Sequence, residues 1–171
     1  MDASRLRLTG TGEGLSTRIT TTLAGVDSPQ KVMEALLTLF PDATKETMEN
    51  EPSLGQPSKA SWTFEDVSLG VFLHQLHEQR ILDTALDAMS LEMNGSTTSF
   101  SIARQAAVAG KIAFPIPGDE PVGGVFRITI SGTGLEDWLQ AATWHSGRGQ
   151  VPRHINDERS MDDDGESTTW V

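Results

Sequence analysis

The spacing of apolar residues in this chain switches between two periods, and that switch limits the possible fold more than any other feature. Alternation, or a run of β-branched residues, predicts strands at 16–26, 44–49, 60–64, 97–103, 111–116 and 125–131. Apolar residues three and four apart predict helices at 28–40, 68–80, 81–93, 104–110 and 134–145. Strands adjacent in sequence favour an antiparallel or mixed sheet, and amphipathic helices favour cover on one face. The sequence therefore predicts a single α+β domain over residues 15–144, with the helices packed on one face of the sheet.

The two ends of the chain lack this patterning. Residues 1–14 are rich in Gly and Thr and predict a flexible arm. Residues 145–171 hold many acidic and few apolar residues, which predicts an acidic disordered tail. The first residues lack the apolar stretch of a secretory signal, and no run approaches the ~20 apolar residues of a membrane-spanning helix. We therefore expect a cytoplasmic protein that does not bind membranes.

The chain is strongly acidic, because 24 Asp and Glu residues stand against 13 Lys and Arg residues and leave a net charge of −11. Only four of the cations are Lys, and Tyr is absent. At ~1 M salt the Debye length is about 3 Å, so an acidic surface costs little repulsion and keeps a protein hydrated. This composition predicts a halophilic protein, with an ordinary acidic protein as the alternative. The charge also disfavours non-specific binding to phosphate backbones, and nothing in it indicates DNA binding.

No motif in the sequence indicates catalysis. The chain has no cysteine, which excludes disulfides, thiolate metal sites and thiol nucleophiles. His74 and His77 lie beside Glu78 on a predicted helix, but the order H-Q-L-H-E differs from the H-E-x-x-H of zinc proteases, and a solvated helix face is the alternative. The glycines at 10, 12 and 14 are not followed by the Lys of a phosphate loop, and no Ser lies in a G-x-S-x-G turn. We expect a protein without catalytic residues, metal or cofactor.

One stretch departs from the acidic average. Residues 93–118 contain no Asp or Glu but carry Arg104 and Lys111, where the average of the chain predicts about three or four acids. Burial in the sheet is one explanation, because folded cores exclude charge. A surface kept free of acids to meet an anion or RNA is the other.

Three separated segments carry a resemblance to a known family: LFPDA at 39–43, QRILDTA at 79–85 and QAAVAGKIAF at 105–114. In this order they resemble an archaea-specific family known as uncharacterised protein family 201. GLEDWL and PVGGVFRITI are also similar, so the resemblance covers about residues 16–144. It implies a fold similar to that of the ribosomal protein that binds 5S rRNA, which has an antiparallel sheet with helices on one side. It also implies RNA binding.

Two functions therefore stay open. The first is a non-catalytic module associated with RNA or a ribonucleoprotein, whose phosphate contacts would be Arg80, Arg104, Lys111 and Arg127. The second is a structural or protein-interaction module without RNA binding, such as a homodimer that pairs through an edge strand or a helix face. Phe100 and Phe114 are predicted to lie in the core rather than to stack on bases.

Overall fold

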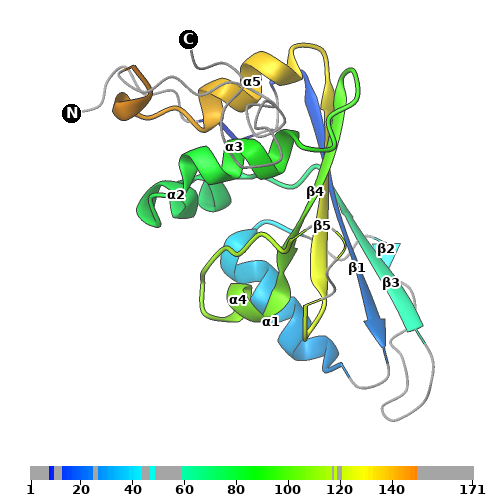
Figure 1. Ribbon diagram of the computed structural model, residues 1–171. Coiled ribbons are helices and arrows are strands. Elements are labelled where there is room, and N and C mark those ends of the chain that lie inside the picture. Colours follow the sequence, from blue (N-terminus) through cyan, green and yellow to red (C-terminus); the bar gives the residue numbers. More distant parts are fainter. Residues whose placement is uncertain are drawn as a thin grey trace.

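The structure is a computed structural model that describes residues 8–9, 13–24, 27–43, 47–48, 59–116, 118 and 121–149 (Figure 1). The strands of this part are β1 (Leu15–Ala24), β2 (Thr47–Met48), β3 (Lys59–Glu65), β4 (Thr97–Ala103) and β5 (Val125–Gly132). They form one sheet in the order β2-β3-β1-β5-β4, and every neighbouring pair is antiparallel. The predicted α+β class with an antiparallel sheet is confirmed.

The strand register gathers apolar side chains on one face of the sheet. Ile19 of β1 lies opposite Phe64 of β3 and Ile128 of β5, and Ile128 lies opposite Phe100 of β4. All four side chains are buried. Successive residues of a strand point to opposite faces, so the residues between them lie on the other face. That second face is polar and carries mostly Ser and Thr.

The helices cover the apolar face. They are α1 (Pro29–Leu39), α2 (Gly70–Glu78), α3 (Leu82–Ser90), α4 (Arg104–Val108), α5 (Leu135–Ala142) and the 3-10 helix η1 (Ser146–Gly149). Figure 1 shows all of them on the same side of the sheet, with α1 and α4 toward one end and α2, α3 and α5 toward the other. The start of α1 follows its sequence signal, because Ser28 caps the helix by accepting from the Lys31 amide at 3.4 Å and Pro29 occupies the first turn.

A chain of phenylalanine rings joins the two groups of helices through the core. Phe40 follows α1 and stacks on Phe72 of α2, with ring centroids 5.7 Å apart. Phe72 stacks on Phe100 of β4 at 6.0 Å, and Phe100 meets Phe114 at 6.3 Å. Phe100 is buried and Phe114 packs against the core, as the sequence predicted. Phe40 and Phe114 belong to two of the family-like segments, so those segments are partly explained by packing.

Residues 111–116 do not form the predicted strand. The segment runs as irregular chain, and its only tie to the end of β4 in the described residues is the bond from the Ala103 amide to the Ala113 carbonyl at 2.9 Å. Pro115 lacks a backbone N–H and cannot donate to a strand ladder. The backbone of Ile112 bonds instead to the side chain of Gln79. Of the strand predicted at 44–49, only the two residues of β2 are described.

Residues on both sides of the predicted domain boundaries contact the rest of the described fold. The Leu69 amide donates to the Thr9 carbonyl at 2.6 Å, and the indole Nε1 of Trp138 donates to Glu13 at 3.1 Å, so two residues of the predicted arm contact the helices. At the other end η1 follows α5 after residues 143–145, and its Arg148 is buried. Residues 1–7, 10–12 and 150–171 of the predicted arm and tail lie outside the described residues.

Candidate functional site

Arg104, one of the four predicted phosphate contacts, is not a surface residue. It is 5% exposed at the start of α4. Its Nε donates to the Gly123 carbonyl at 2.6 Å, and its Nη1 donates to the Thr21 hydroxyl and the Thr22 carbonyl, both at 2.9 Å. Its Nη2 lies 3.2 Å from Asp27. The guanidinium thus joins β1 to the loop before β5, and Arg104 acts as a structural residue because these partners occupy its donors.

Arg127 lies on the polar face of the sheet, where its charge is matched. Its Nη2 pairs with Glu92 at 3.0 Å, and its Nη1 donates to the Ser101 hydroxyl at 3.1 Å. Arg18 on the same face pairs with Glu65 at 2.7 Å. Apart from these pairs the described strands present mainly hydroxyls there: Ser16, Thr20, Thr22, Ser61, Thr63, Thr97, Ser99, Ser101, Thr129 and Ser131. No aromatic side chain of the described strands lies on this face, so it offers no platform for stacking bases.

Arg80 and Lys111, the other two predicted contacts, each lie next to one member of a hydrogen-bonded pair, Gln79 and Ile112. The side-chain amide of Gln79 accepts from the Ile112 amide at 2.7 Å and donates to the Ile112 carbonyl at 3.0 Å. These two hydrogen bonds join the family-like segments 79–85 and 105–114. They place Arg80, next to Gln79, and Lys111, next to Ile112, on adjacent stretches of chain. Both Arg80 and Lys111 are exposed. Among the described residues neither has an ion-pair partner.

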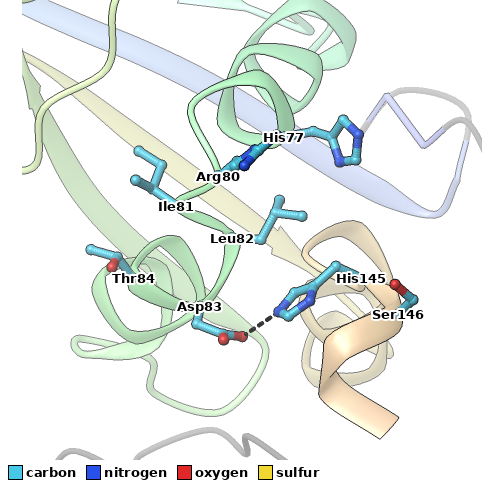
Figure 2. A pocket seen from close by; sticks show the side chains of 8 residues that line it. All are labelled: His77, Arg80, Ile81, Leu82, Asp83, Thr84, His145 and Ser146. Carbon is cyan, nitrogen blue, oxygen red and sulfur yellow. Dashed lines mark hydrogen bonds and ion pairs between the residues drawn. The ribbon is translucent and has the colours of Figure 1, made fainter. Parts of the chain in front are cut away.

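A pocket of about 390 Å³ opens beside Arg80. Three parts of the chain line it: the end of α2, the first turn of α3 and the segment that follows α5. Its lining residues are His77, Arg80, Ile81, Leu82, Asp83, Thr84, His145 and Ser146 (Figure 2). Figure 2 shows Asp83 and His145 reaching toward each other from α3 and from the segment after α5.

Asp83 is the hub of this pocket. Its Oδ1 accepts from Nη2 of Arg148 at 2.7 Å, from Nε of Arg148 at 3.2 Å and from Nε2 of His145 at 3.0 Å. Because an ionised carboxylate only accepts hydrogen bonds, Nε2 of His145 is the protonated ring nitrogen in this contact. Partial burial raises the pKa of Asp83, but the hydrogen bonds and charges of Arg148 and His145 outweigh it and hold that pKa below its ordinary value. Asp83 is therefore ionised at neutral pH and already neutralised by Arg148.

The first turn of α3 has no side-chain cap. Ile81 occupies the N-cap position, and the first amide of the helix to find an intrahelical carbonyl is that of Ala85, which donates to Ile81 at 2.8 Å. The amides of Leu82, Asp83 and Thr84 come before it, and these three residues line the pocket. Arg80 enters this turn with a φ of 57°, a left-handed conformation that is costly for a residue with a Cβ.

The charges around the pocket suit binding an anion. Arg80 lines the pocket, and Arg148 pairs with its carboxylate Asp83, so two cations stand against one anion there. Within the described residues no group of three or more His, Cys, Asp or Glu side chains is placed to hold a metal ion. His74 lies 3.6 Å from Glu78 on the exposed side of α2. His77 lines the pocket, whereas His74 and Glu78 do not.

Sequence reasoning did not single out Asp83, His145 or Arg148. Asp83 lay within the family-like segment 79–85, which was the one signal available for it. His145 and Arg148 fall at the start of the predicted tail, where composition hid them. None of the described helices is both long and apolar enough to cross a membrane.

Comparison with known proteins places the chain in a family. No family model matches it. It is 30% identical over 120 residues to the UPF0201 protein of Sulfurisphaera tokodaii, across 68% of this chain and 81% of that protein. The crystal structure of the UPF0201 protein from Methanococcus jannaschii has a TM-score of 0.64 and 23% identity, over 77% of this chain and 96% of that one. A crystal structure of another UPF0201 protein has a TM-score of 0.60 and 25% identity, over 73% and 90%. The sequence relative covers enough of both chains to decide the matter, and the solved structures agree with it in fold: the chain belongs to the archaeal UPF0201 family.

Proposed function

We propose that this protein is a non-catalytic module that associates with RNA or a ribonucleoprotein. The observation that carries the proposal is the pair of hydrogen bonds between the Gln79 side chain and the Ile112 backbone. Because Arg80 and Lys111 are the chain neighbours of these two residues, they lie on adjacent stretches of chain. Contacts to phosphates position a protein on nucleic acid without reading sequence, and cations without a protein partner are suited to that task. The family resemblance of the sequence implies a fold similar to that of the ribosomal protein that binds 5S rRNA, and we infer the same function from that implication.

The proposal narrows the predicted contact set from four residues to two. Arg104 is excluded because its donors are occupied inside the fold, and Arg127 is matched by Glu92. The polar face of the sheet is excluded as a stacking surface. The two remaining predicted phosphate contacts, Arg80 and Lys111, define a small cationic surface on a chain whose net charge is −11. Two phosphate contacts give weak, salt-dependent binding, so the partner would be a large RNA held also by other proteins.

Ultraviolet crosslinking in the host, followed by stringent purification and sequencing of attached RNA, tests this function. We expect reproducible crosslinks in the unaltered chain that Arg80→Glu together with Lys111→Glu reduces about tenfold or more. Arg18→Glu is the matched control, because it reverses one charge on the polar face and should leave crosslinking unchanged. Abundant, folded protein without crosslinks, or crosslinks insensitive to the double variant, would contradict the proposal.

The edge strand β4 favours a second candidate, a homodimer without RNA. β4 is the long edge of the sheet, and its sequence TTSFSIA contains neither a charge nor a proline to discourage pairing with another strand. Two copies that pair through β4 would extend the sheet across a twofold axis. Sedimentation of the full chain should then give a dimer that Thr97→Lys, at an exposed edge position, converts to monomer. A monomer in the unaltered chain at all concentrations tested removes this candidate.

We propose further that the protein works in a cytosol that holds molar salt. The support is its net charge of −11 and the scarcity of Lys, since acidic repulsion is screened within about 3 Å at ~1 M salt. Circular dichroism across a KCl series tests this. Loss of helical signal in dilute buffer is the expected result, and an equal signal in dilute and molar KCl would rule the idea out.

A further inference from the structure

We propose that the pocket at the start of α3 binds a small phosphate monoester. The pocket shares Arg80 with the cationic surface of Arg80 and Lys111, but it would bind a different ligand. The proposal rests on a cavity of about 390 Å³ and on the guanidinium of Arg80 and the imidazole rings of His77 and His145 that line it. It does not depend on RNA association.

The size of the pocket favours a small organic molecule over a bare ion. Sites for such ligands usually measure about 300–1,000 Å³, and a single phosphate group fills only part of that volume. The wall supplies the two kinds of contact that a phosphate monoester needs. Ile81 and Leu82 offer apolar surface for its organic part, and Thr84 and Ser146 offer hydroxyls.

Charge decides the class of ligand. Asp83 is the one carboxylate among the lining residues, and three donors from Arg148 and His145 converge on its Oδ1. Because Arg148 balances that carboxylate, Arg80 leaves the lining with an excess positive charge. A charged hydrogen bond from a guanidinium to a phosphate oxygen is among the stronger polar contacts in proteins.

The backbone adds donors in the same place. The amides of Leu82, Asp83 and Thr84 precede the first intrahelical bond of α3, and no side chain caps them. Amides in a first turn favour an anion, and here they accompany the side chains that line the cavity. The left-handed conformation of Arg80 turns the chain from α2 into this helix, so the same strained residue carries the charge and sets the geometry of the turn.

Amide NMR of the ¹⁵N-labelled full chain tests the site with three probes: inorganic phosphate, adenosine 5′-monophosphate and adenosine. We expect the nucleotide to shift the signals of Leu82, Asp83 and Thr84 saturably, phosphate to shift them more weakly, and adenosine to leave them in place. Arg80→Gln should weaken nucleotide binding about tenfold, since it removes one charged hydrogen bond. Arg18→Gln, with its charge on the polar face, should have no effect.

A second variant guards against misfolding. Ser146 is exposed, so Ser146→Trp can fill the pocket without disturbing the core, and it should abolish the saturable shifts. Lys111→Glu should leave nucleotide binding intact while it lowers RNA crosslinking, which separates this proposal from the proposed function. No saturable shift with the nucleotide, equal shifts with adenosine, or binding that survives both Arg80→Gln and Ser146→Trp would overturn it.

Discussion

Two arginines are buried to nearly the same extent in this protein, but they are held in different ways. Arg104 is 5% exposed and Arg148 is 4% exposed. Arg104 donates to two backbone carbonyls and a hydroxyl, and it pairs with Asp27. Arg148 directs two of its nitrogens at one oxygen of Asp83, and its Nη1 donates to the Thr143 hydroxyl and the Gln140 carbonyl.

The difference lies in how freely the partners can move. The carbonyls around Arg104 belong to the backbone of β1 and of the loop before β5, so they are less free to turn than a side chain is. Asp83 has a side chain that is 40% exposed at the wall of a pocket, and it shares its contacts with His145. We infer that Arg104 fixes the sheet to its loop, whereas Arg148 supports a pocket whose charge can respond to a ligand.

The largest effect is expected from Arg104→Ala. It leaves the carbonyls of Thr22 and Gly123 without the guanidinium that donates to them, and it leaves the carboxylate of Asp27 without its cation, although the Ala24 amide still donates to Asp27 at 2.8 Å. Removing one member of a buried pair costs about 3–5 kcal/mol, because the partner stays buried and unmatched. The free energy of unfolding from denaturant titration measures this loss. A loss below about 1 kcal/mol would show that Arg104 is as replaceable as a surface cation.

Gly124→Ala tests the same site from the other side. A Cβ at Gly124 would lie 2.5 Å from Nη2 of Arg104, and the residue has a φ of +79°. We expect a loss of about 2–4 kcal/mol, which combines left-handed strain with displacement of the guanidinium.

Gly95→Ala is the matched control for that variant. Gly95 has a φ of +64° with no atom within 4 Å of its Cβ position, so only the conformational cost of about 1 kcal/mol should appear.

A double variant separates the steric part of the Gly124→Ala loss from the conformational part. In the Arg104→Ala background the steric part should vanish, because the guanidinium is absent. Losses that simply add in the double variant would disprove a close approach of glycine to arginine.

The course of the chain was largely predictable from sequence, whereas the roles of its cations were not. Periodicity located α1 and β5 to within a residue or two, because side chains on one face of a strand or helix must share an environment. The periodicity wrongly predicted a strand at 111–116. The alternation in KIAFPI does not reveal that the backbone N–H and C=O of Ile112 are hydrogen-bonded to the side chain of Gln79. That bond joins residues 33 apart in sequence, and no local pattern encodes it.

Burial explains the errors at the site in the same way. The acid-free stretch 93–118 left two explanations open, burial in the sheet or a surface for an anion or RNA; it contains β4, and its Arg104 is buried beside Asp27. Arg148 was overlooked because its surroundings are polar in sequence, although in space α5 and α3 enclose it. A single sequence reports which charges exist, and only the fold reports which of them are paired.

A medium effect is expected from Arg148→Ala. We expect a loss of about 1–3 kcal/mol, smaller than for Arg104→Ala, because Asp83 can turn to water when its partner is lost. The variant should also raise the pKa of Asp83 toward its ordinary value, since hydrogen bonds and charge from Arg148 help to lower it. Titration of the Asp83 carboxyl by NMR measures that change, and an unaltered pKa would mean that Arg148 does not stabilise the carboxylate.

The pH dependence of stability follows from the same lowered pKa. A carboxyl whose pKa is lower in the folded than in the unfolded chain stabilises the fold above its unfolded pKa, and this stabilisation fades as pH falls through the folded value. The ordinary value for Asp83 is 3.8, so the fading belongs to the range below about pH 4. Asp83→Asn should therefore lower the free energy of unfolding at pH 7, and its difference from the unaltered chain should shrink toward pH 2. A constant difference across that range would contradict the ionised pair.

The smallest effect is expected on the polar face of the sheet. Arg18 and Arg127 form ion pairs as short as those of the buried arginines, at 2.7 and 3.0 Å. Their side chains are 58% and 43% exposed, so water competes for both partners and salt screens the pairs. Arg18→Gln and Arg127→Gln should each change the free energy of unfolding by no more than about 0.5 kcal/mol, measured as for Arg104→Ala. If either matched the loss of Arg148→Ala, distance rather than burial would govern these pairs, and the contrast between the two buried arginines would lose its physical basis.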